Sequence, residues 1–315
     1  MNRRNFFFIA LFFLYSVSLN NLFAHPSWGI VVDENGCIYF ADVMHNGDGT
    51  LWKLDPNTQQ LEAVFKKFHA HQIYMNNENE IFAGVAIWRT GEVEDEGHNY
   101  LFKYETNTKT LDTLLFTDDW DEYHGQNFAL SNDYKNIYFS MNKQIHIKLL
   151  QGETQPLLNK KFDRINTLTT DTKGNLWITD SRYNNGTLFK WNKTEGLVEV
   201  SNNIMSQNPS NPIFKEKNHH LFYGIAFTND HKPLITENVN RHITKINNNG
   251  THEIVYESKL YWHPTGVYYK NDNYYIMEVG YKKGHLGPRI IITDKNFKIK
   301  TVYEIDFKNQ KIISN

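Results

Sequence analysis

The sequence is poor in cysteine, because Cys37 is the only one among its 315 residues. A single thiol cannot form a disulfide within the chain, so the fold must be held by its hydrophobic core and by pairing between strands. This excludes the class of small secreted domains that depend on several disulfides. The chain also lacks a C-x-x-C motif, which leaves a thiol redox enzyme without support.

An excess of one charge is also missing. The 33 Lys and Arg residues nearly balance the 35 Asp and Glu residues, for a formal net charge of -2. Because binding to nucleic acid requires a basic face that neutralises phosphates, we expect no nucleic-acid partner. The sequence contains no G-x-S-x-G elbow, Walker loop or H-E-x-x-H motif. Serine hydrolases of the elbow type, P-loop enzymes and zincins therefore have no motif support.

Long hydrophobic runs are absent after the first residues of the chain. Two arginines precede an apolar run over Phe6–Val17, and the small residue Ala24 follows it. This pattern predicts a secretory signal peptide over residues 1–24 and a mature chain over residues 25–315, which begins at His25. The run is short for a membrane span. We therefore expect a periplasmic or secreted protein without membrane contact after cleavage, and an uncleaved N-terminal anchor is the alternative.

The sequence does contain an internal repeat, made of a short β-rich segment, a polar turn and a second β-rich segment. Its six copies begin at Trp28, His71, Asn127, Asn166, Tyr223 and Thr265. A further pair of β-rich segments follows each copy, and these pairs begin at Gly49, Asn99, Gln144, Gly186, Arg241 and Pro288. Each unit therefore carries four strands in about 40 to 57 residues, which is typical of a propeller blade.

These units predict an all-β fold, a six-bladed β-propeller over residues 25–315 with four-stranded antiparallel blades. The helical period of 3.6 is absent, which excludes a helical solenoid. One blade cannot bury both faces of its sheet, so each must stack on its neighbours and the ring must close. We expect the C-terminal tail or the residues after His25 to complete that closure. Aromatic residues of the middle strands, such as Tyr39, Trp52 and Trp177, are expected to fill the space between blades.

Two units are longer than the others. Their extra residues lie in the acidic stretch Thr90–Asn99 and in the polar stretch Ser201–Asn218. Long loops on a rigid β scaffold often contact the substrate, and a tolerated surface insertion is the alternative.

The repeat resembles those of the NHL-repeat and SMP-30/gluconolactonase-like propellers. The pattern G-I-x-x-D-x-x-G-x-I-Y-x-A-D occurs at Gly29–Asp42 and, with Thr for the first Gly, at Thr167–Asp180. In the SMP-30-like enzymes a divalent cation lies on the propeller axis, bound by Glu, Asn and Asp from three repeats. The resemblance places Asn127 at the metal-binding Asn. It places Trp28 and Asn166 where that family has Glu and Asp.

A second resemblance is to the virginiamycin B lyase-like propellers, which use axial His and Glu with Mg²⁺. The segment TENVNRHITKI from Thr236 is similar to their strand ends. This resemblance implies a lyase as an alternative to a hydrolase.

Histidine recurs at one aligned position, at or just before the innermost strand of the repeat. The residues at this position are His25, His69 with His71, His124, Asp163, His220 and His263. Equivalent positions of a propeller lie at equivalent heights around its axis, so we expect these side chains to cluster at one mouth of the central channel. The six repeat starts, from Trp28 to Thr265, form the adjoining layer. That layer is expected to hold a small molecule or a cation bound by oxygen atoms.

The two layers together predict an active site on the axis. His124 and His263 are the predicted catalytic acid or base. The predicted substrate-binding residues are Trp28, Tyr223, Asn166 and His220. The predicted ligands of a divalent metal are His71, Asn127, Asn166, Glu237 and Glu278. Oxygen ligands favour Ca²⁺ or Mg²⁺, whereas imidazole ligands favour Zn²⁺ or Mn²⁺.

The sequence therefore predicts an exported, monomeric, metal-dependent enzyme with a small-molecule or carbohydrate substrate. It would act as a lactonase or esterase, or as a lyase, with the cation polarising an ester, a lactone or a uronate carboxylate. For each histidine taken alone, a hydrogen bond to a neighbouring loop carbonyl is the alternative. The alternative function is a non-catalytic NHL-type propeller that binds a protein or glycan partner.

Overall fold

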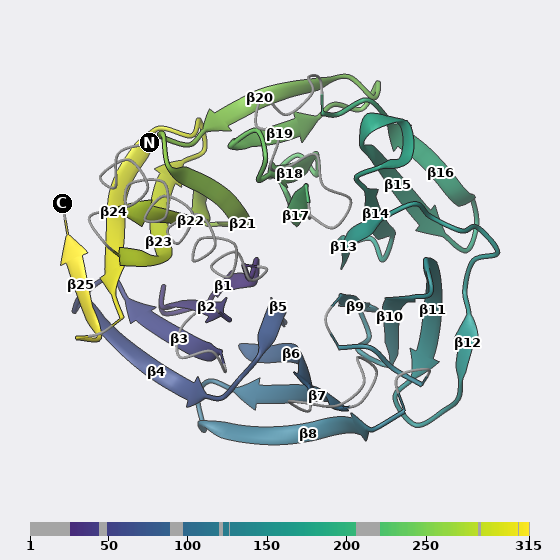
Figure 1. The fold of residues 1–315 in the computed structure, drawn as a ribbon, viewed down its shortest axis with the longest axis horizontal. Coiled ribbons are helices and arrows are strands. Elements are labelled where there is room, and N and C mark those ends of the chain that lie inside the picture. Colours follow the sequence, from purple (N-terminus) through teal and green to yellow (C-terminus); the bar gives the residue numbers. More distant parts are fainter. Residues whose placement is uncertain are drawn as a thin grey trace, which may run out of the picture.

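The computed structural model describes residues 26–43, 49–88, 97–119, 122–125, 127–205, 221–282, 285–307 and 309–314. In these residues the strands form six antiparallel sheets, which stand as blades around a central axis (Figure 1). The prediction of an all-β, six-bladed β-propeller is confirmed. The described helical structure is limited to one short 3₁₀ turn, η1 (Tyr183–Asn185).

The blades follow one another along the chain, and each is built from consecutive strands. Blade 1 contains β1 (Ile30–Val32), β2 (Ile38–Asp42), β3 (Thr50–Asp55) and β4 (Gln60–Lys66). Blade 2 contains β5 (Ala70–Met75), β6 (Glu80–Trp88), β7 (Gly97–Glu105) and β8 (Thr110–Thr117). Blade 3 contains β9 (Phe128–Leu130), β10 (Asn136–Met141), β11 (Gln144–Leu149) and β12 (Thr154–Pro156).

The second half of the ring has the same order. Blade 4 contains β13 (Ile165–Thr170), β14 (Leu176–Asp180), β15 (Thr187–Asn192) and β16 (Gly196–Ser201). Blade 5 contains β17 (Phe222–Phe227), β18 (Pro233–Glu237), β19 (His242–Ile246) and β20 (His252–Glu257). Blade 6 contains β21 (Trp262–Lys270), β22 (Asn273–Lys282), β23 (His285–Asp294), β24 (Ile299–Asp306) and β25 (Lys311–Ser314).

Short polar turns join the first two strands of each blade, and their chemistry follows from the sequence. In blade 4 the carboxylate of Asp171 accepts hydrogen bonds from the backbone N–H groups of Lys173 and Asn175, each at 2.9 Å. Gly174 in the same turn has a φ of 80°, a left-handed conformation that glycine adopts without strain. The turn therefore fixes the pairing of β13 with β14 and so the residue with which each inner strand begins.

Apolar side chains fill the space between neighbouring blades in six clusters, one at each junction. Between blades 1 and 2, for example, Tyr39 packs in one cluster with Ile73 and Ile81. The other clusters join blades 2 and 3, 3 and 4, 4 and 5, 5 and 6, and 6 and 1. Burying a large apolar side chain contributes roughly 1.5–3 kcal/mol. The expected packing of Tyr39, Trp52 and Trp177 between blades is confirmed, since each is at least nine-tenths buried.

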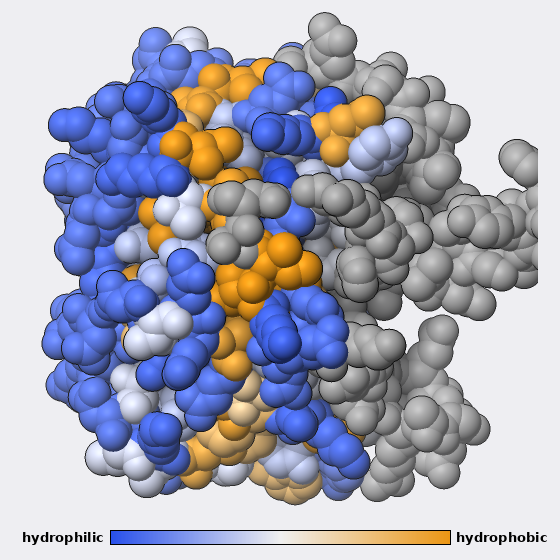
Figure 2. Space-filling view, turned by 90° about the vertical axis from the view of Figure 1, so that its left-hand side faces the viewer, coloured by the Kyte–Doolittle hydropathy of each residue, from blue (hydrophilic) through white to orange (hydrophobic). Residues whose placement is uncertain are grey.

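The ring closes between blades 6 and 1 without exchange of strands. Blade 1 is complete in β1–β4, and β25 adds a fifth strand to the outer edge of β24. Of the two segments expected to complete the closure, the C-terminal tail takes part in it, because Phe307 and Ile312 pack in the cluster between blades 6 and 1. Side chains make this closure: Trp52 contacts Phe307 at 5.4 Å between ring centroids, and Lys270 donates a 2.9 Å hydrogen bond to the carbonyl of Val32. Figure 2 shows this side of the ring, where apolar residues form a band between polar ones.

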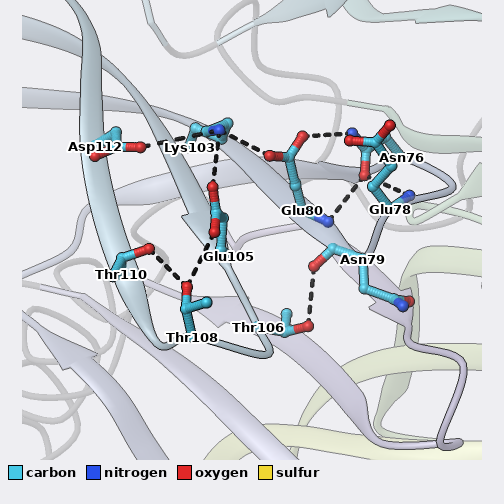
Figure 3. A network of polar contacts seen from close by, with 10 residues as sticks. All are labelled: Asn76, Glu78, Asn79, Glu80, Lys103, Glu105, Thr106, Thr108, Thr110 and Asp112. Atoms are coloured by element: carbon cyan, nitrogen blue, oxygen red, sulfur yellow. Dashed lines mark hydrogen bonds and ion pairs between the residues drawn. The ribbon is translucent and has the colours of Figure 1, made fainter.

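Polar contacts link the outer strands within a blade. In blade 2, Lys103 of β7 lies 2.7 Å from Glu80 of β6 and 3.1 Å from Glu105, and Asp112 of β8 lies 3.9 Å away (Figure 3). The hydrogen bond to Glu80 raises the pKa of Lys103. Single exposed pairs contribute little stability. This network helps to set the register of three neighbouring strands.

Several predictions from the sequence fall on residues outside the described ranges. They are the signal peptide at residues 1–24, His25, His220 and most of the two long stretches, residues 90–96 and 206–218. Within the described ranges, no helix is long and apolar enough to cross a membrane.

The close approach of the inner strands generates a stability prediction. A Cβ atom at Gly266 would lie 2.5 Å from the carbonyl oxygen of Trp28 in the neighbouring blade. We expect Gly266→Ala to lower the free energy of unfolding by about 1–3 kcal/mol, because the backbones must separate. Urea unfolding measures this change. As a control, Gly36→Asn should cost little, since a Cβ there meets nothing within 4 Å and Asn tolerates its left-handed φ. Equal stabilities of Gly266→Ala and wild type would contradict the close packing of the inner strands.

Candidate functional site

Side chains from four blades line one hollow of about 350 Å³ near the axis. Five of its residues belong to the two layers predicted from the sequence, and these are Trp28, His71, His124, Asn127 and Asp163. They come from the starts of the inner strands of blades 1, 2, 3 and 4, or from the residues just before those strands. The repeat symmetry thus brings together residues that are up to 135 positions apart in the chain.

Trp28 forms an aromatic platform across the axis. Its ring stacks on His71 of blade 2 with centroids 5.3 Å apart, and it contacts Tyr223 of blade 5 at 5.6 Å. The N–H groups of Trp28 and Gly29 both donate to the carbonyl of His71, at 2.8 and 2.9 Å. A Cβ atom at Gly29 would lie 2.6 Å from the backbone nitrogen of Ile73, so this approach of blades 1 and 2 requires glycine.

Further along the inner strands, polar side chains of blade 2 form hydrogen bonds with the backbone of blades 3 and 4. Gln72 donates a 2.8 Å hydrogen bond from Nε2 to the carbonyl of Leu168. The Tyr74 hydroxyl lies 2.6 Å from the carbonyl oxygen of Phe128 and 2.5 Å from that of Leu168. Burial raises the pKa of Tyr74, so its hydroxyl keeps the proton that it donates. These contacts link the inner strands of blades 2, 3 and 4. They lie one to three residues further along β5 than His71.

His124 precedes the inner strand of blade 3, and burial changes its proton affinity. Burial lowers the pKa of its imidazole from 6.5 to about 4. The ring is therefore neutral at physiological pH and can accept a proton. An imidazole in this state, at the wall of a polar hollow, is a candidate general base.

The amide of Asn127 connects blades 3 and 4 in the wall of the hollow. Its Oδ1 accepts a 3.1 Å hydrogen bond from the N–H of Leu168, and its Nδ2 lies 3.4 Å from the hydroxyl of Ser140. Asn166, the next residue predicted as a ligand, is 1% exposed at the start of β13 and does not belong to the lining. The side chain of Asn127 thus has a structural role as well as a position in the hollow.

A buried carboxylate holds the segment that contributes Asp163. Asp180, which is fully buried, accepts hydrogen bonds from the backbone N–H groups of Asp163 at 2.7 Å and Arg164 at 2.9 Å. It also accepts from the N–H groups of Arg182 and Tyr183, each at 3.1 Å. One acidic residue at the end of β14 therefore positions the segments on both sides of it.

The remaining predicted residues lie away from the lining. His263 points one ring nitrogen, Nδ1, at the carbonyl of Asn238, 2.7 Å away, and burial lowers its pKa. This is the loop-carbonyl contact that the sequence left as the alternative. Thr265, the sixth residue of the inner layer, is fully buried, and its carbonyl accepts a 3.0 Å hydrogen bond from Thr236.

The two predicted carboxylate ligands are engaged by other side chains, Glu237 within blade 5 and Glu278 by residues of blades 5 and 6. Glu237 accepts hydrogen bonds from the hydroxyl of Thr244 and, at 3.0 Å, from the amide of Asn240. Glu278 accepts from the Tyr256 hydroxyl at 2.8 Å, and its other oxygen lies 2.5 Å from Nε of Arg289. Neither residue lines the hollow.

The donor atoms in the described part of the chain do not complete a metal centre. Of the predicted ligands, His71 and Asn127 reach the hollow, and His69 lies beside His71 with ring centroids 5.1 Å apart. Among the residues described by the structure, no group of three or more His, Cys, Asp or Glu side chains is placed to hold a metal ion. The donor set seen here does not fit a cation held by protein ligands alone, so no chemical step is derived through a metal.

The sequence interpretation missed two parts of the wall. One is Ser140–Lys143, which comprises the end of β10 and the turn before β11, and the other is Arg164–Ile165 at the start of blade 4. Arg164 directly follows the aligned position Asp163, so the repeat alignment could have found it. The turn could not be found in this way, because it lies between the second and third strands, where no recurring residue marks it.

A scan against models of protein families found no match, and neither did a search of curated proteins. The solved structures similar to this chain include virginiamycin B lyase from Staphylococcus aureus, with 12% identity over 87% of this chain and 93% of that one, at a TM-score of 0.50. A streptogramin B lyase is similar at 16% identity, 93% and 96% coverage and a TM-score of 0.53. A PQQ-bound aldose sugar dehydrogenase from Streptomyces coelicolor is similar at 11% identity, 86% and 94% coverage and a TM-score of 0.55.

These likenesses concern the fold, because the identities lie between 11% and 16%. The neighbours are six-bladed propellers, which supports the resemblance to the lyase-like propellers at the level of architecture. The resemblance to the SMP-30 and NHL propellers stays a prediction. The chain has the architecture of a six-bladed propeller, on which these lyases and this sugar dehydrogenase are also built.

Proposed function

We propose that the hollow is the active site of an exported propeller enzyme that acts on a small or carbohydrate-derived substrate. The observation that carries this proposal is the convergence of His71, His124, Asn127 and Asp163 from three blades on one hollow beside the Trp28 platform. Polar and titratable groups that converge in a hollow with an aromatic wall are the usual mark of a small-molecule site. Export rests on the predicted signal peptide at residues 1–24.

His124 is the residue to which we assign proton transfer. In an esterase or lactonase reaction, its neutral imidazole would take a proton from the attacking water. In a lyase reaction it would take the proton next to a carbonyl or carboxylate group. Both reactions need a base that is unprotonated at working pH, and burial keeps His124 in that state. Trp28 offers an aromatic surface for the substrate, while Tyr223, predicted as a second binding residue, is buried against Trp28 and does not line the hollow.

The alternative function is a propeller that binds its ligand without turnover. The placement of Glu237, Glu278 and His263 away from the hollow favours this alternative, since it removes three residues of the predicted catalytic and metal-binding set. The hollow serves a ligand in both cases. The two functions are separated by whether turnover depends on His124.

The first test is the loss of turnover on substitution of His124. A panel of lactones, aryl esters and uronate oligosaccharides identifies a substrate for the wild type. On that substrate we expect His124→Gln to lower kcat by roughly 10²- to 10⁴-fold, because the proton acceptor is removed. His231→Asn is the matched control, since His231 is exposed in the turn between β17 and β18. Full activity of His124→Gln would overturn the assignment. A wild type that binds panel members without converting any of them would support the non-catalytic alternative.

The second test is the pH dependence of stability. His124 has a pKa of about 4 in the fold and about 6.5 when unfolded, so between these values only the unfolded chain binds the proton. The free energy of unfolding is therefore at its full value above pH 6.5, and His124 lowers it by up to about 3 kcal/mol as the pH falls to 4. Urea unfolding at several pH values should show a smaller decrease for His124→Gln than for wild type, while His231→Asn keeps the wild-type decrease. An imidazole of His124 that titrates near 6.5 by NMR would contradict this.

The third test is removal of divalent cations. A cation that only the folded chain binds would raise its stability. Because the donor set of the described residues does not complete a metal centre, we expect EDTA to leave the melting temperature unchanged, and elemental analysis of the purified protein provides the second measurement. A melting temperature that falls with EDTA and is restored by Ca²⁺ or Mg²⁺ would contradict this and return a cation to the site.

A further inference from the structure

Two cationic side chains line the hollow and have no role in the chemistry described so far. Arg164 is half-buried at the start of blade 4, and Lys143 is exposed in the turn between β10 and β11. One carboxylate, Asp163, lines the same hollow. Together, Arg164, Lys143 and Asp163 therefore carry a net positive charge, although the whole chain has a formal net charge of -2.

Backbone hydrogen bonds fix where these two cations stand. The N–H of Arg164 donates to Asp180 at 2.9 Å, and its carbonyl accepts a 3.1 Å hydrogen bond from the N–H of Ser181. The carbonyl of Lys143 accepts a 2.8 Å hydrogen bond from the N–H of Phe162, two residues before Arg164. Hydrogen bonds thus hold the turn of blade 3 against the first residues of blade 4. These bonds use main-chain atoms, so they fix the backbone of Arg164 and Lys143, and the positions of the guanidinium and ammonium groups depend on other contacts.

The charges around Arg164 favour an anion at this place. Burial and the positive charge of Arg182 both lower the pKa of Arg164, which means that its protonated form lacks part of the stabilisation that water would give. An anion that enters the hollow would be attracted to Arg164 and Lys143 and would replace part of the lost hydration.

The aromatic platform lies close to these charges. Trp28 lines the same hollow as Arg164 and Lys143. A ligand that reaches both groups must carry an apolar face and an anionic group a few ångströms apart. Sugar acids and other small cyclic carboxylates have this form.

We propose that the hollow selects a ligand with a carboxylate group, held by Arg164 with Lys143 as a second cation, while Trp28 contacts its ring. A guanidinium presents two parallel N–H donors that match the two oxygens of a carboxylate. A dianionic phosphate is disfavoured, because Asp163 also lines the hollow. This inference rests on the proposed function in one respect, that the hollow is the ligand site. The class of ligand that it names is a small organic acid, such as a uronate.

The test compares glucuronate with glucose, which have the same ring but differ in the carboxylate. Calorimetric titration of the wild-type protein should show tighter binding of glucuronate. Arg164→Gln should weaken glucuronate binding by roughly 10- to 100-fold and leave glucose binding little changed, because a hydrogen-bonded charge pair contributes about 1.5–3 kcal/mol. Arg164→Lys should fall between the two, since it keeps the charge and loses the paired donors. Lys143→Gln should weaken glucuronate binding less, because Lys143 is exposed.

The matched control is Lys173→Gln, which makes the same change of charge at an exposed site in the turn between β13 and β14. It should bind glucuronate as the wild type does. Unchanged glucuronate affinity in Arg164→Gln, equal affinity of the wild type for glucose and glucuronate, or no binding of either sugar would each overturn the inference. Tighter binding of inorganic phosphate than of glucuronate would indicate a phosphate site and would also overturn the inference. Glucuronate binding that depends on Arg164, in a protein without turnover, would leave the inference standing and remove the proposed enzyme.

Discussion

The structure depends on the apolar packing of each blade against both of its neighbours around a closed ring. Each sheet has two faces to bury, and six clusters of apolar side chains, one at each junction, bury them. The junction between blades 6 and 1 is the one that joins the two ends of the chain, and Trp52 and Phe307 meet there. With a single cysteine in the sequence, this packing and the pairing of strands must hold the ring.

Closure of the ring also creates the candidate site. When six wedge-shaped blades meet, their inner strands approach so closely that glycine is required where Gly29 faces Ile73 and where Gly266 faces Trp28. The residues next to these glycines then face one another around the axis. Trp28 and His71 stack for this reason, although they belong to different blades. The same crowding removes water from His124 and lowers its proton affinity.

Residues of one chemical type have different tasks in this arrangement. Asp180 is fully buried and uses its carboxylate to position backbone segments, whereas Asp163, exposed at the hollow, is positioned by it. Glu278 forms a buried pair with Arg289, while Arg164 lines the hollow. The difference comes from the partners that each side chain meets across neighbouring strands. It determines which charged side chains line the hollow.

The sequence by itself determined the propeller architecture and showed that its six units are repeats of one four-stranded pattern. Turn residues such as Asp171 and Gly174 act within a few positions, and alternating apolar residues define each strand, so the blades could be located from local patterns. Repetition then placed equivalent residues at equivalent heights, which is why Trp28, His71, His124, Asn127 and Asp163 could be assigned to one mouth of the channel before the structure was known.

Only the tertiary structure decided which of these positions share a hollow. His263 is equivalent to His124 in the repeat, yet it contacts the carbonyl of Asn238 outside the lining. Glu237 is engaged by Thr244 of its own blade, whereas Glu278 accepts a hydrogen bond from Tyr256 of the neighbouring blade 5. Lys143 reaches the hollow from a turn that no repeat position marks. The physical reason is that a repeat fixes the height and direction of the backbone, whereas the contacts of a side chain depend on neighbours that differ from blade to blade.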